Sequence, residues 1–234
     1  NFEIKLSKIR DVESQGMLCS DKELGISNES EGIRILPADA PVGKAFAEYM
    51  GFDDVTLELS VSPNRADCLS HFGLAREVAA LTGAAVKKPE PKVKAGSGST
   101  KKTISLEVKE AGLCPRYSGL YISGVKVAPS PAWLKQKLEG VGLKSINNIV
   151  DVTNFVMMEL GQPMHAFDED KISGAITIRR AKKNEKITLL NGEKKRLSSE
   201  DLVIADNKKA LALAGVMGGA DSAIDPKTKN IFLE

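Results

Sequence analysis

The sequence predicts an α+β protein that is divided into several units. The last part of the chain has two helical patterns followed by a run of short strand patterns, without regular alternation of strand and helix. The stretch KKPEPKVKAGSGSTKK at 87–102 has the composition of a solvated linker. A length of 234 residues allows two or three units. We therefore expect units at 1–50, 51–95 and 103–234, with the linker running to 102; a phosphate-contacting basic segment is the alternative for that linker.

Composition indicates an ordinary globular protein, with 42% hydrophobic and 27% charged residues and a net charge of +2. This charge gives no global basic field, although local basic patches are still possible. Three cysteines that lie far apart, Cys19, Cys68 and Cys114, indicate reduced thiols in the cytoplasm. We expect no structural metal, no signal peptide and no membrane span. Because the chain opens on Asn1 and stops at Glu234 in a strand-like run, we expect it to be a part of a longer protein.

The first residues favour short strands and loops. Glycines punctuate the segment 1–50, and a short helix is expected at 42–51. Alternating apolar residues in VTLELSVSP (55–63) predict a strand that ends at Pro63.

A turn and a helix follow that strand. We expect Arg65 and Asp67 to fix the turn rather than to contact a bound partner. The helix covers 69–83, with Gly83 as its C-terminal stop. His71 lies on this helix and is interpreted as a scaffold residue.

The third unit opens with predicted strands at 103–108 and 118–127. Ser130 is predicted to cap a helix that has Pro131 at its first position. Ser145 is predicted to cap the next helix, which ends at Gly161. The strands expected after it are AITIRRA (175–181), KITLL (186–190), LVIAD (202–206) and ALALAG (210–215), with Asn191-Gly192 as a hairpin turn.

Polar residues within and after the helix at 145–160 form the first candidate site. Thr153 and Asn154 do not fit the apolar stripe, and both have poor helix propensity. The stretch GQPMHAFD then brings His165 back near the helix end, where the helix dipole would favour a protonated imidazole. On spacing alone, a cap or a half-buried polar residue explains His165 better than a site does.

Three acids follow this histidine, Asp168, Glu169 and Asp170. Acidic clusters next to a histidine can bind a metal. They are more often solvated loop residues, which is what we expect here.

The glycines of ALAGVMGGADS form the second candidate site. Gly215 and Gly218 follow an apolar strand, as in loops that bring backbone N–H groups to a ligand, but a tight turn explains them equally well. The pattern is neither a P-loop nor a dinucleotide fingerprint. Since no Ser-His-Asp or Cys-His order stands out, any hydrolysis would rest on a positioned water and preorganised dipoles.

Three long motifs carry a resemblance to a known family. They are ELSVSPNRADCLSHFGLAREVAALTG, SINNIVDVTNFVMMELGQPMHAFD and LVIADNKKALALAGVMGGADSAI. Together they resemble the β subunit of bacterial phenylalanyl-tRNA synthetase. The earlier segment KIRDVESQGMLCSDKELGI is similar to the closing part of that subunit's OB-type tRNA-binding domain. By this resemblance, 1–50 is the end of the OB-type domain, 51–95 a structural α/β unit, and 103–234 an editing domain that is truncated at its end.

The resemblance implies a partner and a reaction. The family enzyme is an (αβ)₂ heterotetramer that charges tRNA(Phe) with phenylalanine, using ATP and Mg²⁺. Its synthetic active site lies in the α subunit, so this chain itself needs no cofactor. The β subunit instead hydrolyses tyrosine that is wrongly esterified to tRNA(Phe). The alternative is a non-catalytic scaffold that binds tRNA and the α subunit.

The resemblance also implies a set of editing residues. His165, Asn154 and Thr153 would orient the terminal adenosine, the ester carbonyl or the attacking water. Glu234 would accept the tyrosine hydroxyl. Gly215 and Gly218 also match the pocket of the family, and the Gly218 backbone would line it. The resemblance therefore makes His165 a functional residue.

Overall fold

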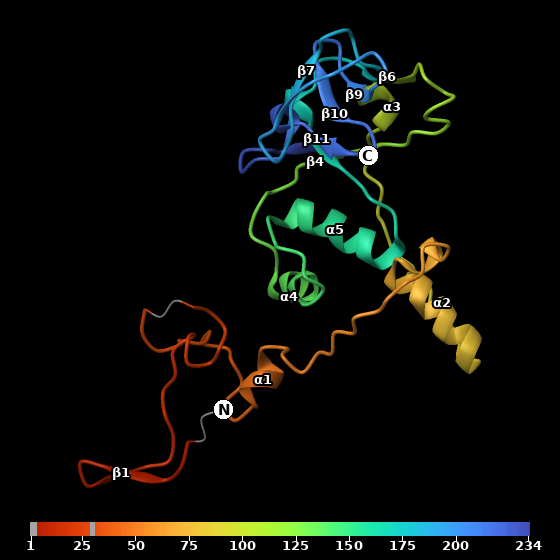
Figure 1. The fold of residues 1–234 in the computed structure, drawn as a ribbon. Helices are drawn as coiled ribbons and strands as arrows, with labels where there is room; N and C mark the ends of the chain where they lie inside the picture. The colour runs from red at the N-terminus through yellow and green to blue at the C-terminus, as the bar shows by residue number, and fades with distance from the viewer. Residues whose placement is uncertain (1–3, 29–30) are drawn as a thin grey trace. The chain divides into compact units, whose positions relative to one another are not determined.

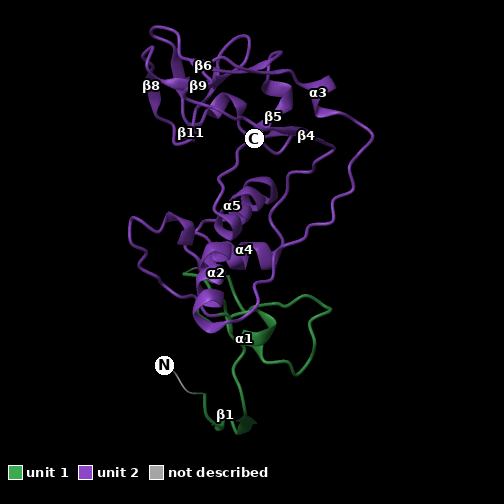
Figure 2. Ribbon diagram, turned by 90° about the vertical axis from the view of Figure 1, so that its right-hand side faces the viewer, with its two compact units in different colours: residues 1–54 green, residues 55–234 purple. Residues whose placement is uncertain are grey.

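The computed structural model describes residues 4–28 and 31–234 (Figure 1). The chain forms two compact units, 1–54 and 55–234 (Figure 2). The expected first segment begins within residues 1–3, which lie outside the described residues. Residues 51–54 of the expected second segment belong to the first unit, whereas the rest of that segment and the expected third segment fall within the second unit.

Unit 1 contains few regular elements among its described residues. Strands β1 (Ser7–Ile9) and β2 (Val12–Ser14) pair in antiparallel fashion. Helix α1 (Phe46–Tyr49) confirms the helix expected at 42–51.

The strand expected at 55–63 is not present, so that prediction is wrong. Val55, Leu57 and Leu59 do alternate along an extended segment, but each is more than half exposed. An alternating pattern becomes a strand only where a second strand supplies hydrogen bonds, and no described strand pairs with this segment.

The turn and the helix after this segment are confirmed. Arg65 donates two hydrogen bonds to the Asp67 carboxylate beside the short helix η1 (Ala66–Cys68). Helix α2 (His71–Thr82) starts at Ser70, whose hydroxyl accepts from Gly73 N, and Gly83 ends it with φ +73°.

The linker region has no regular element over 87–98, and its side chains are exposed. Helix α3 (Thr100–Thr103) follows directly. The linker therefore reaches unit 2's sheets through one helical turn.

Unit 2 is built on three sheets, which confirms the α+β class. The largest has the order β11-β10-β9-β6-β3, and only β3 and β6 run parallel. Its strands are β3 (Leu106–Val108), β6 (Ile176–Arg180), β9 (Leu202–Ala205), β10 (Ala210–Leu213) and β11 (Met217–Gly218). The expected strands at 103–108, 175–181, 202–206 and 210–215 are all present, although β3 begins only at Leu106.

Two smaller sheets complete the unit. In the first, β12 (Asn230–Leu233) lies between β4 (Leu120–Ser123) and β5 (Ala166–Asp168) and is antiparallel to both. In the second, β7 (Lys186–Thr188) and β8 (Lys194–Arg196) form a hairpin. Gly192 has φ +84° in its turn, which confirms the predicted Asn191-Gly192 turn.

The five-stranded sheet has a hydrophobic core on each face. Along β9, Ile204 points into one core, and Val203 and Ala205 point into the other. The first core lies towards the three-stranded sheet and contains Phe167 and Phe232. Burial on both faces explains why the strand reads as a continuous apolar run.

Two helices pack together beneath these sheets. Helix α5 (Asn148–Leu160) lies between the sheets and α4 (Ala132–Gly140), as both ribbon views show (Figures 1 and 2). The rings of Trp133 on α4 and Phe155 on α5 pack edge to face, with their centroids 5.6 Å apart. No described helix combines the length and the apolar character that a bilayer span requires.

The predicted serine caps of these helices are wrong. Asn147 caps α5 by accepting from two backbone N–H groups, and α4 begins at Ala132, after Pro131, without a side-chain cap. The Ser130 and Ser145 hydroxyls instead donate to Oδ2 of Asp151, each at 2.5 Å.

Asp151 thereby becomes a buried anchor, with no exposed surface. Its Oδ1 accepts from Ile146 N at 2.8 Å. Burial disfavours the charged form of Asp151, but these hydrogen bonds outweigh it and hold the pKa of the carboxyl below its ordinary value. One carboxylate therefore fixes the starts of both helices.

We predict that Asp151→Ala lowers the free energy of unfolding by about 3 kcal/mol or more, because it strands two hydroxyls and one N–H group. Since the folded pKa is lowered, this stabilisation is present at neutral pH and is lost as the pH falls below 3.8. Urea unfolding at several pH values measures both effects. Asp170→Ala, on an exposed acid, is the control; equal losses in the two variants would contradict the anchor role.

Candidate functional site

A pocket of about 190 Å³ opens where the exit from α5, the β10–β11 turn and the end of β12 meet. Four of the predicted site residues line it: His165, Gly215, Gly218 and Glu234. Its remaining walls are apolar and come from Pro163, Met164, Ile204, Ala212, Leu213, Val216 and Met217. The fold therefore brings together residues that lie up to 69 positions apart in the sequence.

Unpaired polar atoms distinguish this pocket. Among the described residues, three side chains carry a buried polar atom that lacks a hydrogen-bond partner: Tyr117 Oη, His165 Nε2 and Glu234 Oε2. His165 and Glu234 line the pocket, and Tyr117 lies beside the Glu234 carboxylate. Buried polar groups are nearly always paired in folded proteins, so this concentration indicates a place where a ligand supplies the partners.

His165 is held in place by backbone and ring contacts. Its carbonyl oxygen accepts from Glu234 N at 2.8 Å, and its ring meets Phe167 edge-on at 4.5 Å. A Cβ on Gly218 would lie 2.3 Å from the imidazole Cε1, so only glycine leaves room for this ring. Burial lowers the pKa of His165, which makes it a neutral imidazole at pH 7. The histidine thus forms a wall of the pocket and does not cap α5.

Glu234 and Tyr117 face each other across the end of β12. Burial raises the pKa of Glu234, and the nearby Tyr117 hydroxyl partly offsets this rise. Burial, reinforced by the Glu234 carboxylate, raises the pKa of Tyr117 well above its ordinary value. The two groups approach without forming a hydrogen bond of good geometry, so Glu234 keeps an open acceptor.

Thr153 and Asn154 are not among the residues that line the pocket. Thr153 is 7% exposed, and its hydroxyl donates to the carbonyl of Val150 in the previous turn at 2.7 Å. Asn154 is half-buried on the same helix.

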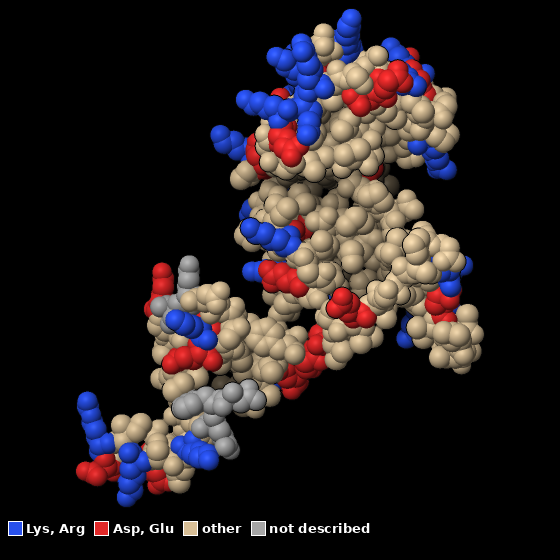
Figure 3. Space-filling model, in the orientation of Figure 1, with Lys and Arg blue, Asp and Glu red and all other residues tan. Residues whose placement is uncertain are grey.

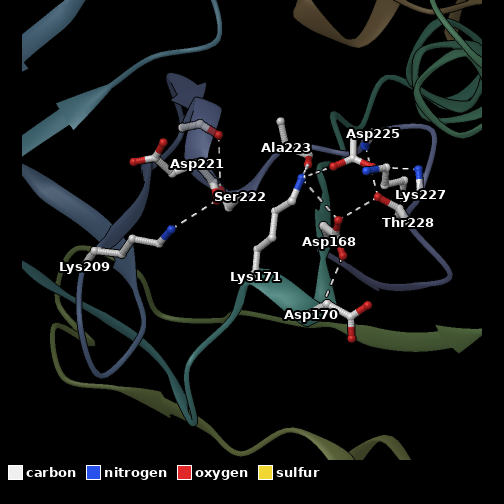
Figure 4. Close-up of polar contacts among 11 residues, drawn as sticks. Asp168, Asp170, Lys171, Lys209, Asp221, Ser222, Ala223, Asp225, Lys227 and Thr228 are labelled. Atoms are coloured by element: carbon white, nitrogen blue, oxygen red, sulfur yellow. Dashed lines mark hydrogen bonds and ion pairs between the residues drawn. The ribbon is translucent and has the colours of Figure 1, made fainter.

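The interpretation of Asp168 as a surface acid is wrong. It is 3% exposed, accepts from the Thr228 hydroxyl at 2.7 Å and pairs with Lys171 at 3.3 Å (Figure 4). Lys171 also donates to the Ala223 carbonyl and to Asp225, each at 2.7 Å. This network ties β5 to the loop that leads into β12, and so helps to place Glu234. Asp170 is exposed, as expected, and Glu169 is half-buried.

A larger pocket of about 530 Å³ lies between α4, the start of α5 and the 224–226 loop. Its hydroxyl and amide side chains already have hydrogen-bond partners within the protein. The Ser130 and Ser145 hydroxyls donate to Asp151, and Asn147 Oδ1 accepts from the backbone at the start of α5. The smaller pocket is therefore the better candidate site.

Possible metal ligands, among the described residues, gather at Asp67, Cys68 and Glu77. Arg65 already forms ion pairs with both carboxylates there. The guanidinium accounts for this cluster without a metal ion.

Tyr117 is the residue that sequence reasoning missed. It lies 117 positions before Glu234, and nothing in its local pattern, CPRYSGLY, indicates a site. Only the pairing of β4 with β12 brings the two regions together.

The amino-acid sequence is similar to a known domain family and to known proteins. The family model described as B3/4 domain matches residues 113–234, just over half of the chain. The phenylalanine–tRNA ligase β subunit of Bdellovibrio bacteriovorus is 58% identical over the whole chain, and that of Fusobacterium nucleatum is 56% identical. The chain spans 29% of the length of each of these relatives.

Solved structures also match this chain. One of them is an N-terminal fragment of the phenylalanyl-tRNA synthetase β subunit from Pyrococcus horikoshii, 20% identical, with a TM-score of 0.42. The match covers 77% of this chain and 57% of that one.

We predict that the His165 imidazole titrates below 6.5, since burial lowers its pKa, and that Gly218→Ala moves this pKa back towards 6.5 by displacing the ring. Proton NMR titration of the imidazole measures both. Gly112→Ala is the control, because a Cβ there meets no atom within 4 Å. An unchanged titration in Gly218→Ala would contradict the close packing of Gly218 on His165.

Proposed function

Because the chain belongs to the B3/4 domain family and resembles phenylalanine–tRNA ligase β subunits along its whole length, we propose that it hydrolyses misacylated Tyr-tRNA(Phe) as the editing part of such a subunit. Phenylalanine activation, with ATP and Mg²⁺, belongs to an α subunit. The full protein is an (αβ)₂ heterotetramer that acts in the cytoplasm. The part described here contributes the editing pocket.

The observation that carries this proposal is the set of unpaired polar atoms at one small, mostly apolar pocket. A tyrosyl group matches it, with an aromatic ring for the apolar wall and a phenolic hydroxyl for an open acceptor. Hydrolysis of an ester also needs a group that orients water, and His165 Nε2 is free for this.

Editing supplies selectivity that the synthetic site lacks. A hydrophobic pocket for phenylalanine rejects an analogue with one added hydroxyl by only about 10²-fold. A second pocket built around Glu234 inverts the preference, because phenylalanine would leave the buried acceptor unpaired at a cost of about 1–3 kcal/mol. Burial raises the pKa of Glu234, and the same burial makes an unpaired oxygen of this carboxyl costly.

The chemistry needs no covalent nucleophile. Water attacks the ester carbonyl carbon, the bond from this carbon to the ribose oxygen breaks, and the ribose oxygen takes a proton. Neutral His165 accepts a hydrogen bond from the attacking water or donates one to the ester carbonyl. Preorganised polar groups of this kind stabilise the charge that develops in the transition state.

Of the remaining predicted residues, Gly215 and Gly218 line the pocket, whereas Thr153 and Asn154 do not. Gly218 leaves room for the imidazole, and Gly215 has φ +70° in the turn that closes the pocket. Thr153 and Asn154 lie on the helix that leads to His165, where we assign them to orienting the terminal adenosine. Thr153 would do this through the helix, since its hydroxyl is occupied.

For the assembled ligase, we predict that His165→Ala lowers the deacylation rate of Tyr-tRNA(Phe) by about 10²-fold or more, because the positioned water is lost. Charging of tRNA(Phe) with phenylalanine stays near normal, since that reaction uses the α subunit. The control is His71→Ala; His71 is exposed and bonds to the carbonyl of Met158. Unchanged deacylation in His165→Ala would rule out the role and would favour a non-catalytic scaffold.

We also predict that Glu234→Ala lowers the preference for Tyr-tRNA(Phe) over Phe-tRNA(Phe) in deacylation by about 5- to 150-fold, which corresponds to the loss of one buried acceptor. The ratio of kcat/KM for the two substrates measures it. Glu107→Ala, on an exposed residue of β3, should leave the ratio unchanged. If the ratio also stays constant in Glu234→Ala, the hydroxyl assignment is wrong.

A further inference from the structure

The hairpin β7–β8 concentrates positive charge in a nearly neutral chain. Residues 182–196, which we call the basic hairpin, contain six of the 33 basic residues and two of the 31 acidic residues. The rest of the chain therefore has 27 basic and 29 acidic residues, a formal charge of −2, while the basic hairpin has +4. Figure 3 shows Lys and Arg side chains gathered over the end of unit 2 where Figure 1 labels β7. The charge is thus local to one surface.

Cations of the basic hairpin are exposed and mostly unneutralised. All six of its basic side chains are exposed: Lys182, Lys183, Lys186, Lys194, Lys195 and Arg196. Glu185 is turned away into a two-point ion pair with Arg179, and Glu193 pairs with Lys195. Lys183, Lys186, Lys194 and Arg196 form no ion pair with any residue that the structure describes.

The register of the hairpin places like charges opposite each other. Lys186 pairs directly with Arg196, and Thr188 pairs with Lys194, so three cations share one face while Ile187 points into the core. Like charges at directly opposite positions destabilise a two-stranded ladder. Lysines can blunt a sheet edge against aggregation, but that role does not require a cation on both strands of one pair. The arrangement is stabilised when an external anion lies across the face.

The basic hairpin is fixed to the wall of the pocket. Leu190 N donates to the Gly218 carbonyl at 3.0 Å, and Leu189 forms a β-bridge with Gly219. Ile187 and Leu189 are buried in the second core. Gly218, in turn, contacts His165. The cations therefore have a set position relative to the catalytic imidazole.

We propose that the basic hairpin binds backbone phosphates of the tRNA whose aminoacyl end enters the pocket. This inference rests on the proposed function, because the substrate is then a polyanion joined directly to the group in the pocket. Lys186, Lys194 and Arg196 present three cations on one rigid face, as phosphate contacts require. The contact sets the register of the RNA and does not read its sequence.

The test uses the assembled ligase and the triple variant Lys186→Gln/Lys194→Gln/Arg196→Gln. Binding of uncharged tRNA(Phe) is measured across KCl concentrations. The slope of log Kd against log [KCl] should fall by about 2, since each lost phosphate contact removes roughly 0.7–0.9. The matched control, Lys126→Gln/Lys144→Gln/Lys229→Gln, removes equal charge from exposed sites outside both the hairpin and the linker and should keep the slope.

Deacylation separates RNA docking from chemistry. In the hairpin variant, KM for Tyr-tRNA(Phe) should rise about tenfold with kcat unchanged. Hydrolysis of the tyrosyl ester of adenosine, which has no phosphate, should equal that of the wild type. The melting temperature should be unchanged or higher, because the like-charge pair is gone.

Several outcomes would overturn the inference. One is an unchanged salt slope in the hairpin variant, and another is an equal fall in the control. A third is a loss of binding to anionic lipid vesicles with tRNA binding intact, which would assign the hairpin to a membrane surface. If the wild type does not deacylate Tyr-tRNA(Phe), the proposed function fails, whereas the salt slope still tests the hairpin.

Discussion

The placement of strand β12 between β4 and β5 is the constraint on which the site depends. The ladder with β5 continues one residue further, through the hydrogen bond from Glu234 N to the His165 carbonyl. This bond places the carboxylate and the imidazole on the same pocket, although they are 69 residues apart. The ladder with β4 brings in the region of Tyr117. Gly119 permits this packing, since a Cβ there would lie 1.9 Å from the Phe232 ring.

Two buried carboxylates differ in whether their oxygens are hydrogen-bonded. Asp151 accepts hydrogen bonds from two hydroxyls and a backbone N–H group, and the pKa of its carboxyl is lowered. Glu234 is buried with an oxygen left unpaired, and the pKa of its carboxyl is raised. A satisfied charge anchors helices, whereas an unsatisfied one is a cost in the free protein that a ligand can relieve. The Asp168 carboxylate is also satisfied, by Lys171 and its network, and this network helps to hold Glu234 in place.

The basic hairpin and the pocket are parts of one assembly. The basic hairpin is bonded to the main chain of Gly218 and Gly219. On the pocket side, the His165 imidazole packs against Gly218. A small selective pocket for an amino-acid side chain provides little binding area by itself. If the proposed tRNA contact holds, a row of cations beside the pocket would supply affinity without adding to that selectivity, which suits a substrate whose RNA is common to correct and incorrect products.

Features that depend on a few neighbouring residues could be predicted from the amino-acid order. Gly83 and Gly161 ended their helices because each adopts a left-handed conformation that glycine favours, and Asn191-Gly192 formed its turn for the same reason. Local pattern raised His165, Gly215 and Gly218 as candidates without deciding between a site and a structural role, and the family resemblance added Glu234; all four line the pocket. Tertiary structure decided the rest: the missing partner of 55–63, the use of Ser130 and Ser145 by Asp151, the burial of Asp168, and the meeting of Tyr117 with Glu234. Each of these depends on a hydrogen bond, a missing strand or a packed contact between segments distant in the chain, and no local propensity encodes it.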